Sequence, residues 1–230
     1  MRRLAVLALC LAACGTPARR PAPVPPPPPP PPAADPQLPP PPPPIVANAS
    51  VWTRDAGGQL RGESGRVPLP YLGMRLEVLQ VDTLQLLVRC VHCLGSPQGW
   101  IAREAVIHHP RRPADARSGD LAEFVLAVRD AAARQDVEAL RPVMSRDFVH
   151  SLGPLDMGLL ETFAAWEREQ YRTLDRMPFI LDRGVASVPG TAVWAAPPEW
   201  VSTPGYTDVR AGFRRGEDGW EWIFLVRNGA

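Results

Sequence analysis

The stretch WEWIFLVR, residues 220–227, gives the clearest indication of how the second half of the chain folds and predicts a strand. Successive side chains of a strand point to opposite faces of its sheet. One face is therefore predicted to carry Trp220, Trp222, Phe224 and Val226, and the other Ile223 and Leu225. A strand that is apolar on both faces lies inside a domain, with helices packed against one side of the sheet.

Immediately before this strand, Glu217-Asp218-Gly219 predicts a hairpin turn. Further strands are predicted at residues 179–187, 191–196 and 205–214. Three helices are predicted ahead of them. The first starts at Leu121, the second has Asp136 as its N-cap and reaches Met144, and the third begins near Asp156 and ends at Pro178.

Three helices followed by a long, curved antiparallel sheet resemble the NTF2-like (SnoaL-like) cone fold. The resemblance is carried by the opening helix, by Leu140–Phe148 and by Tyr206–Val226, and it implies an α+β domain at residues 118–230. It also implies that the sheet can serve as a homodimer surface. The fold includes isomerases, dehydratases, hydrolases and many non-enzymatic members, so it does not assign a function.

An enzymatic member of such a fold needs a general acid or base inside the cone, with a pKa shifted by burial. The polar candidates are Asp147, His150, Tyr171, Asp182 and Asp208. No two of them stand at a spacing that a reaction would require, and each also has a structural explanation, so no catalytic residue is assigned.

Aromatic residues are the other candidates in this half, because they can line a mouth for a hydrophobic ligand or a sugar. Trp166 and Trp194 fall on a predicted helix and strand, where a core position is the usual explanation. Trp200 follows Pro197-Pro198-Glu199 in a predicted loop. Trp200 and Tyr206 are therefore the candidate binding residues here.

Residues 48–109 form a separate predicted module of short strands, and 110–117 form a polar linker. The order of the motifs in residues 48–109 resembles a bacterial SH3-like (SH3b) domain. They are Arg54, Leu69 to Leu72, the run Gly73 to Leu79, Leu86 to Arg89, Gly99-Trp100-Ile101 and Val106. The resemblance implies a small all-β barrel that contacts peptidoglycan or an envelope protein. Trp52 and Tyr71 are the candidate contact residues, whereas Trp100 is expected in the core.

Cys90 and Cys93 are the cysteines outside the N-terminal region, and a disulfide is the favoured interpretation. Such a short loop adds at most roughly 2 kcal/mol of stability. Zinc would need further ligands from His92, His108 and His109, and redox catalysis would need a helix N-terminus after the first cysteine, where a turn is predicted instead. Neither a metal nor a cofactor is expected.

The segment from Pro17 to Pro44 holds 18 of the 30 prolines, and a proline-rich tether is predicted over residues 14–47. Its polyproline II part, residues 17–47, reaches at most roughly 95 Å at about 3.1 Å per residue. A spacer is the favoured interpretation, and a docking ligand for a polyproline-binding groove is the alternative.

Residues 1–13 are predicted to be a signal peptide, with Arg2 and Arg3 before a short apolar run. Leu11-Ala12-Ala13-Cys14-Gly15 resembles the bacterial lipobox, which implies that Cys14 is lipidated. An ordinary leader cut after Ala13 is the alternative. The lipobox and Gly15 together imply a cell-envelope protein, lipid-anchored in the outer membrane and facing the periplasm.

The formal charge of +1 is spread over the chain and argues against a nucleic-acid partner. We expect a non-enzymatic envelope lipoprotein whose SH3-like module contacts peptidoglycan or an envelope protein, while the NTF2-like module is a ligand pocket or an association surface. The alternatives are an envelope enzyme or small-molecule binder acting in the cone, and a purely structural spacer. A cone filled by aromatic side chains would favour the non-enzymatic interpretation.

Overall fold

The computed structural model describes residues 43–63, 65–151 and 157–227, which all belong to one compact unit, Pro42–Ala230. The predicted signal peptide at 1–13, the lipidated Cys14 and most of the predicted tether lie outside the described residues.

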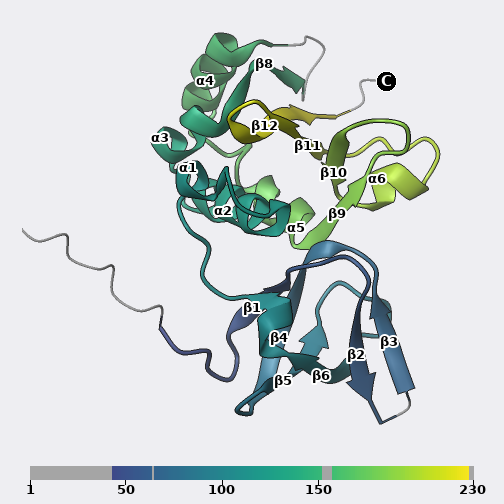
Figure 1. Cartoon of the computed structure of the whole chain (residues 1–230). Helices are drawn as coiled ribbons and strands as arrows, with labels where there is room; N and C mark the ends of the chain where they lie inside the picture. The colour runs from purple at the N-terminus through teal and green to yellow at the C-terminus, as the bar shows by residue number, and fades with distance from the viewer. Residues whose placement is uncertain (1–42, 64, 152–156, 228–230) are drawn as a thin grey trace, which may run out of the picture. The chain divides into compact units, whose positions relative to one another are not determined.

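Seven strands, here called the N-terminal strands, form the first part of the described chain (Figure 1). They are β1 (Ser50–Thr53), β2 (Gly58–Gly62), β3 (Gly65–Leu69), β4 (Leu72–Val81), β5 (Gln85–Cys90), β6 (Gln98–Ala102) and β7 (Val106–Ile107). Every second side chain points inward, so that Leu76 and Val78 on β4 and Leu86 and Val88 on β5 are buried in one apolar cluster. Trp100 on β6 is half-buried instead of lying fully in this core.

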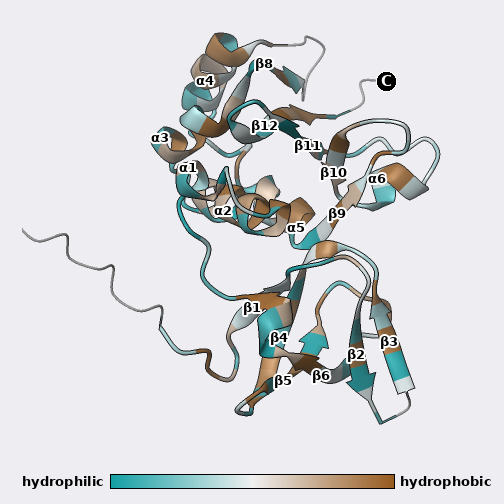
Figure 2. Ribbon diagram, viewed as in Figure 1, coloured by the Kyte–Doolittle hydropathy of each residue, from teal (hydrophilic) through white to brown (hydrophobic). Residues whose placement is uncertain are grey.

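Residues 113–227, the C-terminal part, contain six α-helices and five strands among the described residues. The helices are α1 (Pro113–Ala116), α2 (Leu121–Ala133), α3 (Val137–Leu140), α4 (Leu159–Arg168), α5 (Arg176–Leu181) and α6 (Glu199–Ser202). The strands are β8 (Met144–Ser151), β9 (Arg183–Ser187), β10 (Val193–Ala196), β11 (Arg210–Gly216) and β12 (Gly219–Val226). Apolar residues run along α2, and nine of its thirteen residues are buried (Figure 2).

The predicted fold class is wrong, because the two predicted modules share one 12-stranded mixed sheet. Its main strand order is β3-β2-β6-β5-β4-β9-β10-β11-β12-β8, and β1 joins it beside β4 and β7. The N-terminal end of the long strand β4 pairs with β9 through Leu72 with Val185 and Met74 with Arg183. An isolated SH3-like barrel followed by a separate cone of three helices on an antiparallel sheet does not describe this arrangement. Periodicity predicts where strands lie in the sequence, but it does not predict which strands are neighbours.

Two prolines account for further differences from the predicted elements. The second helix ends at Leu140, before a 3₁₀ turn over Arg141–Val143, and Met144 begins strand β8. Pro142 lacks the N–H that would continue the helix. Pro178 was expected to end a helix, but it lies in the first turn of α5, where a missing N–H costs nothing. Residues 179–181, predicted as strand, are therefore helical.

The strand predicted at 220–227 is confirmed as β12, Gly219–Val226, but its two faces differ from the alternating pattern. The pairing of β12 shifts register between Trp222 and Phe224, opposite Gly212 and Phe213 of β11. Trp222 and Leu225 consequently share the core beneath the helices, although simple alternation separates them. Strand β8 runs parallel to β12, so this end of the sheet is mixed.

Candidate functional site

Trp52, a predicted contact residue, lies inside the molecule between the N-terminal strands and helix α2. Its indole Nε1 donates to Oδ1 of Asp182 at 2.9 Å, and the Arg129 guanidinium lies 5.1 Å above its ring. Arg129 also donates two hydrogen bonds to the Asp182 carboxylate, at 2.9 and 3.0 Å. The predicted binding role of Trp52 is corrected to a structural one, because its ring is covered. Asp182, a candidate acid or base, is an ion-pair partner here.

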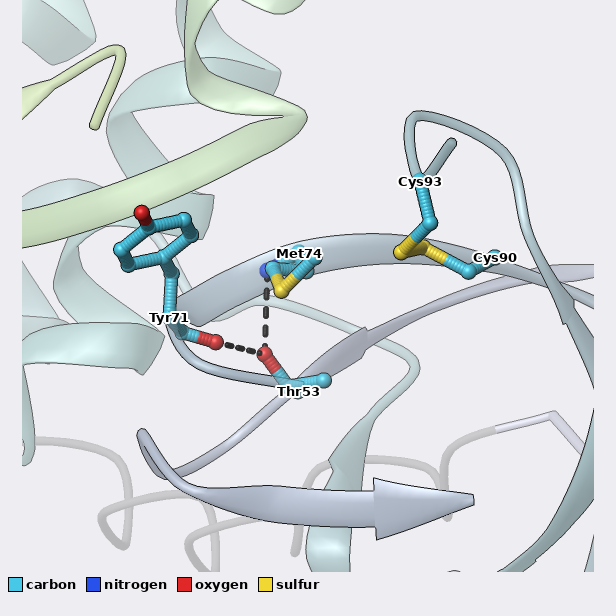
Figure 3. The surroundings of a disulfide bond; sticks show 5 residues. All are labelled: Thr53, Tyr71, Met74, Cys90 and Cys93. Carbon is cyan, nitrogen blue, oxygen red and sulfur yellow. Dashed lines mark hydrogen bonds between the residues drawn. A yellow bond between two sulfur atoms is a disulfide. The ribbon is translucent and has the colours of Figure 1, made fainter. Parts of the chain in front are cut away.

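Tyr71 lies at the turn before β4 and is half-buried. Thr53 Oγ1 donates to the carbonyl of Tyr71 at 2.9 Å and accepts from the Met74 N–H at 3.0 Å (Figure 3). Tyr71 packs against the apolar cluster of the N-terminal strands. Tyr71 therefore helps to hold the β1–β4 contact, and it presents only part of its ring to a partner.

The predicted disulfide between Cys90 and Cys93 is present, with the two Cα atoms 5.4 Å apart (Figure 3). Cys90 is fully buried among the N-terminal strands, and Cys93 is half-buried beside the same cluster. Between them, the ring of His92 meets that of Phe179 on α5 edge to face, with centroids 6.4 Å apart. The disulfide therefore closes the turn between β5 and β6, and His92 within that turn contacts the C-terminal part.

The space between α4 and the sheet is filled by aromatic rings. Trp166 and Trp222 stack with centroids 5.8 Å apart, and Phe148 meets both of them edge to face. All three are at most 1% exposed. The interior predicted to be a ligand pocket is packed side chain to side chain at this place.

His150 lies against this aromatic group and is 1% exposed. Its Nε2 accepts a hydrogen bond from Trp166 Nε1 at 3.4 Å, and its Nδ1 is buried without a partner among the described residues. Since Nε2 accepts, the neutral ring carries its proton on Nδ1. Burial lowers the pKa of His150, with the nearby Glu169 acting weakly in the opposite direction.

Asp147 is exposed on β8 and forms a two-pronged ion pair with Arg214 of β11, at 2.7 and 2.9 Å. The hydrogen bond from Arg214 lowers the pKa of this carboxyl group. Both line an open, charged groove of about 440 Å³ with Arg146 and the β11–β12 hairpin. A paired, water-exposed carboxylate is an anchor between strands and a weak candidate for a general base.

Trp200, predicted in a loop, lies instead on the short helix α6, and Tyr206, predicted in the strand at 205–214, lies in the segment before β11. Arg210 lies 4.9 Å above the Trp200 ring, which meets Phe224 edge to face at 5.9 Å. The Tyr206 hydroxyl donates to the Val209 carbonyl at 3.5 Å, and burial raises the pKa of Tyr206. Asp208, the last candidate acid or base, is exposed and accepts from the Val209 N–H. These residues close a loop over the sheet.

Tyr171 is brought into a groove of about 450 Å³ that sequence reasoning missed. We call it the Tyr171 groove, and it is lined by Gln135, Asp136, Val137, Glu138, Arg141, Phe163, Glu167 and Tyr171. The Arg141 guanidinium lies 4.5 Å above the Phe163 ring and pairs with Glu138 at 3.4 Å. No sequence signal joins these residues, because they come from α3, from α4 and from the turns that follow α2 and α4.

In the part of the chain that the structure describes, no three histidine, cysteine, aspartate or glutamate side chains gather in a way that could hold a metal ion. His108 and His109 lie against each other, with ring centroids 3.9 Å apart and ring planes tilted by 55°. The described residues also contain no helix that is both long and apolar enough to span a bilayer.

Comparison with known proteins gives no family for this chain: no family model and no curated protein matches it. Among solved structures, it is similar to a chain named Rd1NTF2_05 that carries five substitutions, at 12% sequence identity. That match covers 46% of this chain and 94% of the other, with a TM-score of 0.29. A likeness this low carries no conclusion about the fold.

Proposed function

We propose that this protein is a non-enzymatic, lipid-anchored protein of the bacterial cell envelope, in the outer membrane and facing the periplasm. A tether holds its folded part away from the membrane, where that part contacts peptidoglycan. The N-terminal sequence supports the anchor, through the apolar leader, Cys14 and the proline-rich segment. An envelope protein is the alternative partner.

The observation that carries the non-enzymatic proposal is the stack of Phe148, Trp166 and Trp222 between α4 and the sheet. Catalysis needs a polar group beside a space that admits substrate. His150 is the titratable group nearest to this stack, and its Nε2 already accepts from Trp166. The two open grooves, one at Asp147 and one at Tyr171, are lined neither by His150 nor by the three aromatic rings.

The absence of lysine from the whole chain makes the lipid anchor directly testable. Acylation of the amino group of Cys14 leaves a mature protein without any primary amine. An amine-reactive dye should therefore not label the native protein from membranes, but it should label a Cys14→Ser protein cleaved by an ordinary peptidase. Recovery of the native mature protein in the soluble fraction would disprove the lipid anchor, whereas labelling of a membrane-bound protein would show only that the amino group of Cys14 is not acylated.

Wall contact is tested separately by pelleting the full-length Cys14→Ser protein with purified sacculi. We expect saturable cosedimentation that is absent for heat-unfolded protein. A Trp52→Phe protein should pellet like the parent once its folding is verified, because Trp52 is covered by Arg129. No cosedimentation of the folded parent protein would overturn peptidoglycan as the partner.

A further inference from the structure

We propose that the Tyr171 groove binds a primary ammonium group carried by a peptide of the cell wall. This inference depends on the proposed function for the source of the ammonium group, but the chemistry of the groove stands on its own residues.

The groove carries an excess of negative charge. Three carboxylates, Asp136, Glu138 and Glu167, line it together with one guanidinium, Arg141, so its formal charge is 1 − 3 = −2. Asp136 is engaged as the N-cap of α3, accepting from the Ala139 N–H at 3.1 Å. Glu167 is exposed and takes part in no ion pair with another described residue. This carboxylate is available to an added cation.

The chain itself already places one cation in the groove. Arg141 sits over Phe163 and pairs with Glu138, which combines an aromatic face with a carboxylate. Such a combination attracts organic cations through the ring quadrupole and through direct charge attraction. Tyr171 and Glu167 offer the same two kinds of group, and no arginine of the described chain lies over the Tyr171 ring.

The backbone holds Tyr171 at the groove. Gln170 and Tyr171 both have left-handed conformations, with φ of 54° and 59°, directly after α4. The Tyr171 N–H donates to the Trp166 carbonyl at 2.7 Å, and the Tyr171 carbonyl accepts from Leu174 at 2.9 Å. Left-handed backbone costs a residue with a side chain about 1–2 kcal/mol, so this turn is kept in place by its surroundings. The backbone of Tyr171 is therefore fixed at the edge of the groove.

A primary ammonium group fits better than a neutral sugar, because a sugar could use the ring but would gain nothing from the charge of −2. The chain cannot supply such a group from its own side chains, since all of its 25 cationic side chains are arginines. Peptides of the cell wall carry free amino groups, and the proposed function brings the groove to them. A lysine of a partner protein is the competing source, which the experiment separates.

The test uses the full-length Cys14→Ser protein with native sacculi and with sacculi whose amines have been acetylated. We expect acetylation to weaken pelleting about threefold to tenfold. Glu167→Gln, which keeps the shape and removes the charge, should weaken binding to native sacculi by a similar factor and leave binding to acetylated sacculi unchanged. Tyr171→Asn should weaken binding to native sacculi in the same way, because asparagine tolerates the left-handed backbone and has no ring. Glu161→Gln, an exposed carboxylate of α4 outside the groove, is the matched control.

A small probe separates the groove from the wall. Nα-acetyl-lysine methylamide should shift the NMR signals of Glu167 and Tyr171, and its Nε-acetylated form should not. Probe binding without any pelleting would overturn the wall source and the proposed wall contact, but it would keep the ammonium site and point to a partner's lysine. Pelleting that is indifferent to acetylation and to Glu167→Gln, with no probe binding, would overturn the groove proposal alone.

Discussion

Asp182 follows the last residue of α5 and is 4% exposed, yet it is fully surrounded by donors. Trp52 of β1 and Arg129 of α2 both donate to its carboxylate, and Arg75 of β4 lies 3.6 Å away. Its backbone carbonyl also accepts from the Arg75 N–H at 2.8 Å. One residue therefore connects the N-terminal strands, the longest helix and the start of β9.

Replacing this carboxylate should be costly. Asp182→Ala leaves the Trp52 N–H buried without its acceptor and leaves the Arg129 guanidinium with only Asp130, at 3.3 Å. Loss of one member of a buried pair costs about 3–5 kcal/mol. Urea unfolding followed by tryptophan fluorescence measures the change in the free energy of unfolding. Asp208→Ala is the control, because that side chain is 64% exposed and its arginine partner is 3.8 Å away. Equal effects of the two substitutions would contradict the role given to Asp182.

The buried ring of His150 predicts how stability depends on pH. Its pKa is lowered in the folded state, so below pH 6.5 the unfolded chain binds more protons than the folded chain. Folding stability is therefore complete above that pH and falls as the pH decreases below it. His150→Gln keeps an acceptor for Trp166 and does not titrate, so it should reduce the slope of unfolding free energy against pH between 6.5 and 5. The remaining slope comes from His92 and His108, whose pKa values burial also lowers. The exposed His109→Gln should change the slope less, because His109 acts only through its charge beside His108, and the reverse order would refute the assignment.

In the β11–β12 hairpin, one glycine allows a close contact between two distant elements. Gly219 has a φ of 117°, and a Cβ there would lie 2.4 Å from the carbonyl oxygen of Arg117. The Trp220 N–H donates to that same carbonyl at 2.8 Å, which connects the hairpin to the segment after α1. The turn itself was predictable from Glu217-Asp218-Gly219, but its contact with Arg117 was not, since it joins residues a hundred positions apart.

Two glycines allow the contact to be separated from the backbone conformation. Gly190 has a φ of 73° and would place a Cβ in open space, so Gly190→Ala should cost only the roughly 1–2 kcal/mol of left-handed backbone. Gly219→Ala adds a clash with main-chain atoms and should cost more, by about 1–3 kcal/mol. Thermal unfolding of both variants provides the comparison. A Gly190→Ala protein that is as unstable as Gly219→Ala would show that the clash is relieved by movement.

Other elements show which signals the sequence carries and which it lacks. Strand β12, helix α2 with its Asp120 N-cap, and the Cys90–Cys93 disulfide follow from local patterns, because each depends on neighbouring residues. The partners of Trp52 and the lining of the Tyr171 groove depend on which distant segments meet. The periodicity of a single sequence does not show which distant segments are in contact. Of the residues that line the groove, the sequence therefore predicted only Tyr171 as a candidate.

For the whole molecule, the pairing of β4 with β9 and the Asp182 contacts join what the sequence presents as two modules. We expect one cooperative unfolding transition for the described part of the chain. Probes in each half, the disulfide region and the Trp166–Trp222 stack, should report the same midpoint and slope in urea. Met74→Pro, which introduces a proline into the β4–β9 pairing, should lower both midpoints together. Two separate transitions would show that the halves fold independently.

The continuous sheet also determines how the protein responds to tension. A pull on the N-terminal end of the described chain reaches β1 first, which is held between β4 and β7. Strand β4 then passes the force to β9, and the Asp182 ion pair resists separation beside it. In a single-molecule pulling experiment, the described part should therefore rupture in one event. A protein built this way transmits a mechanical load through both halves at once, instead of losing them one after the other.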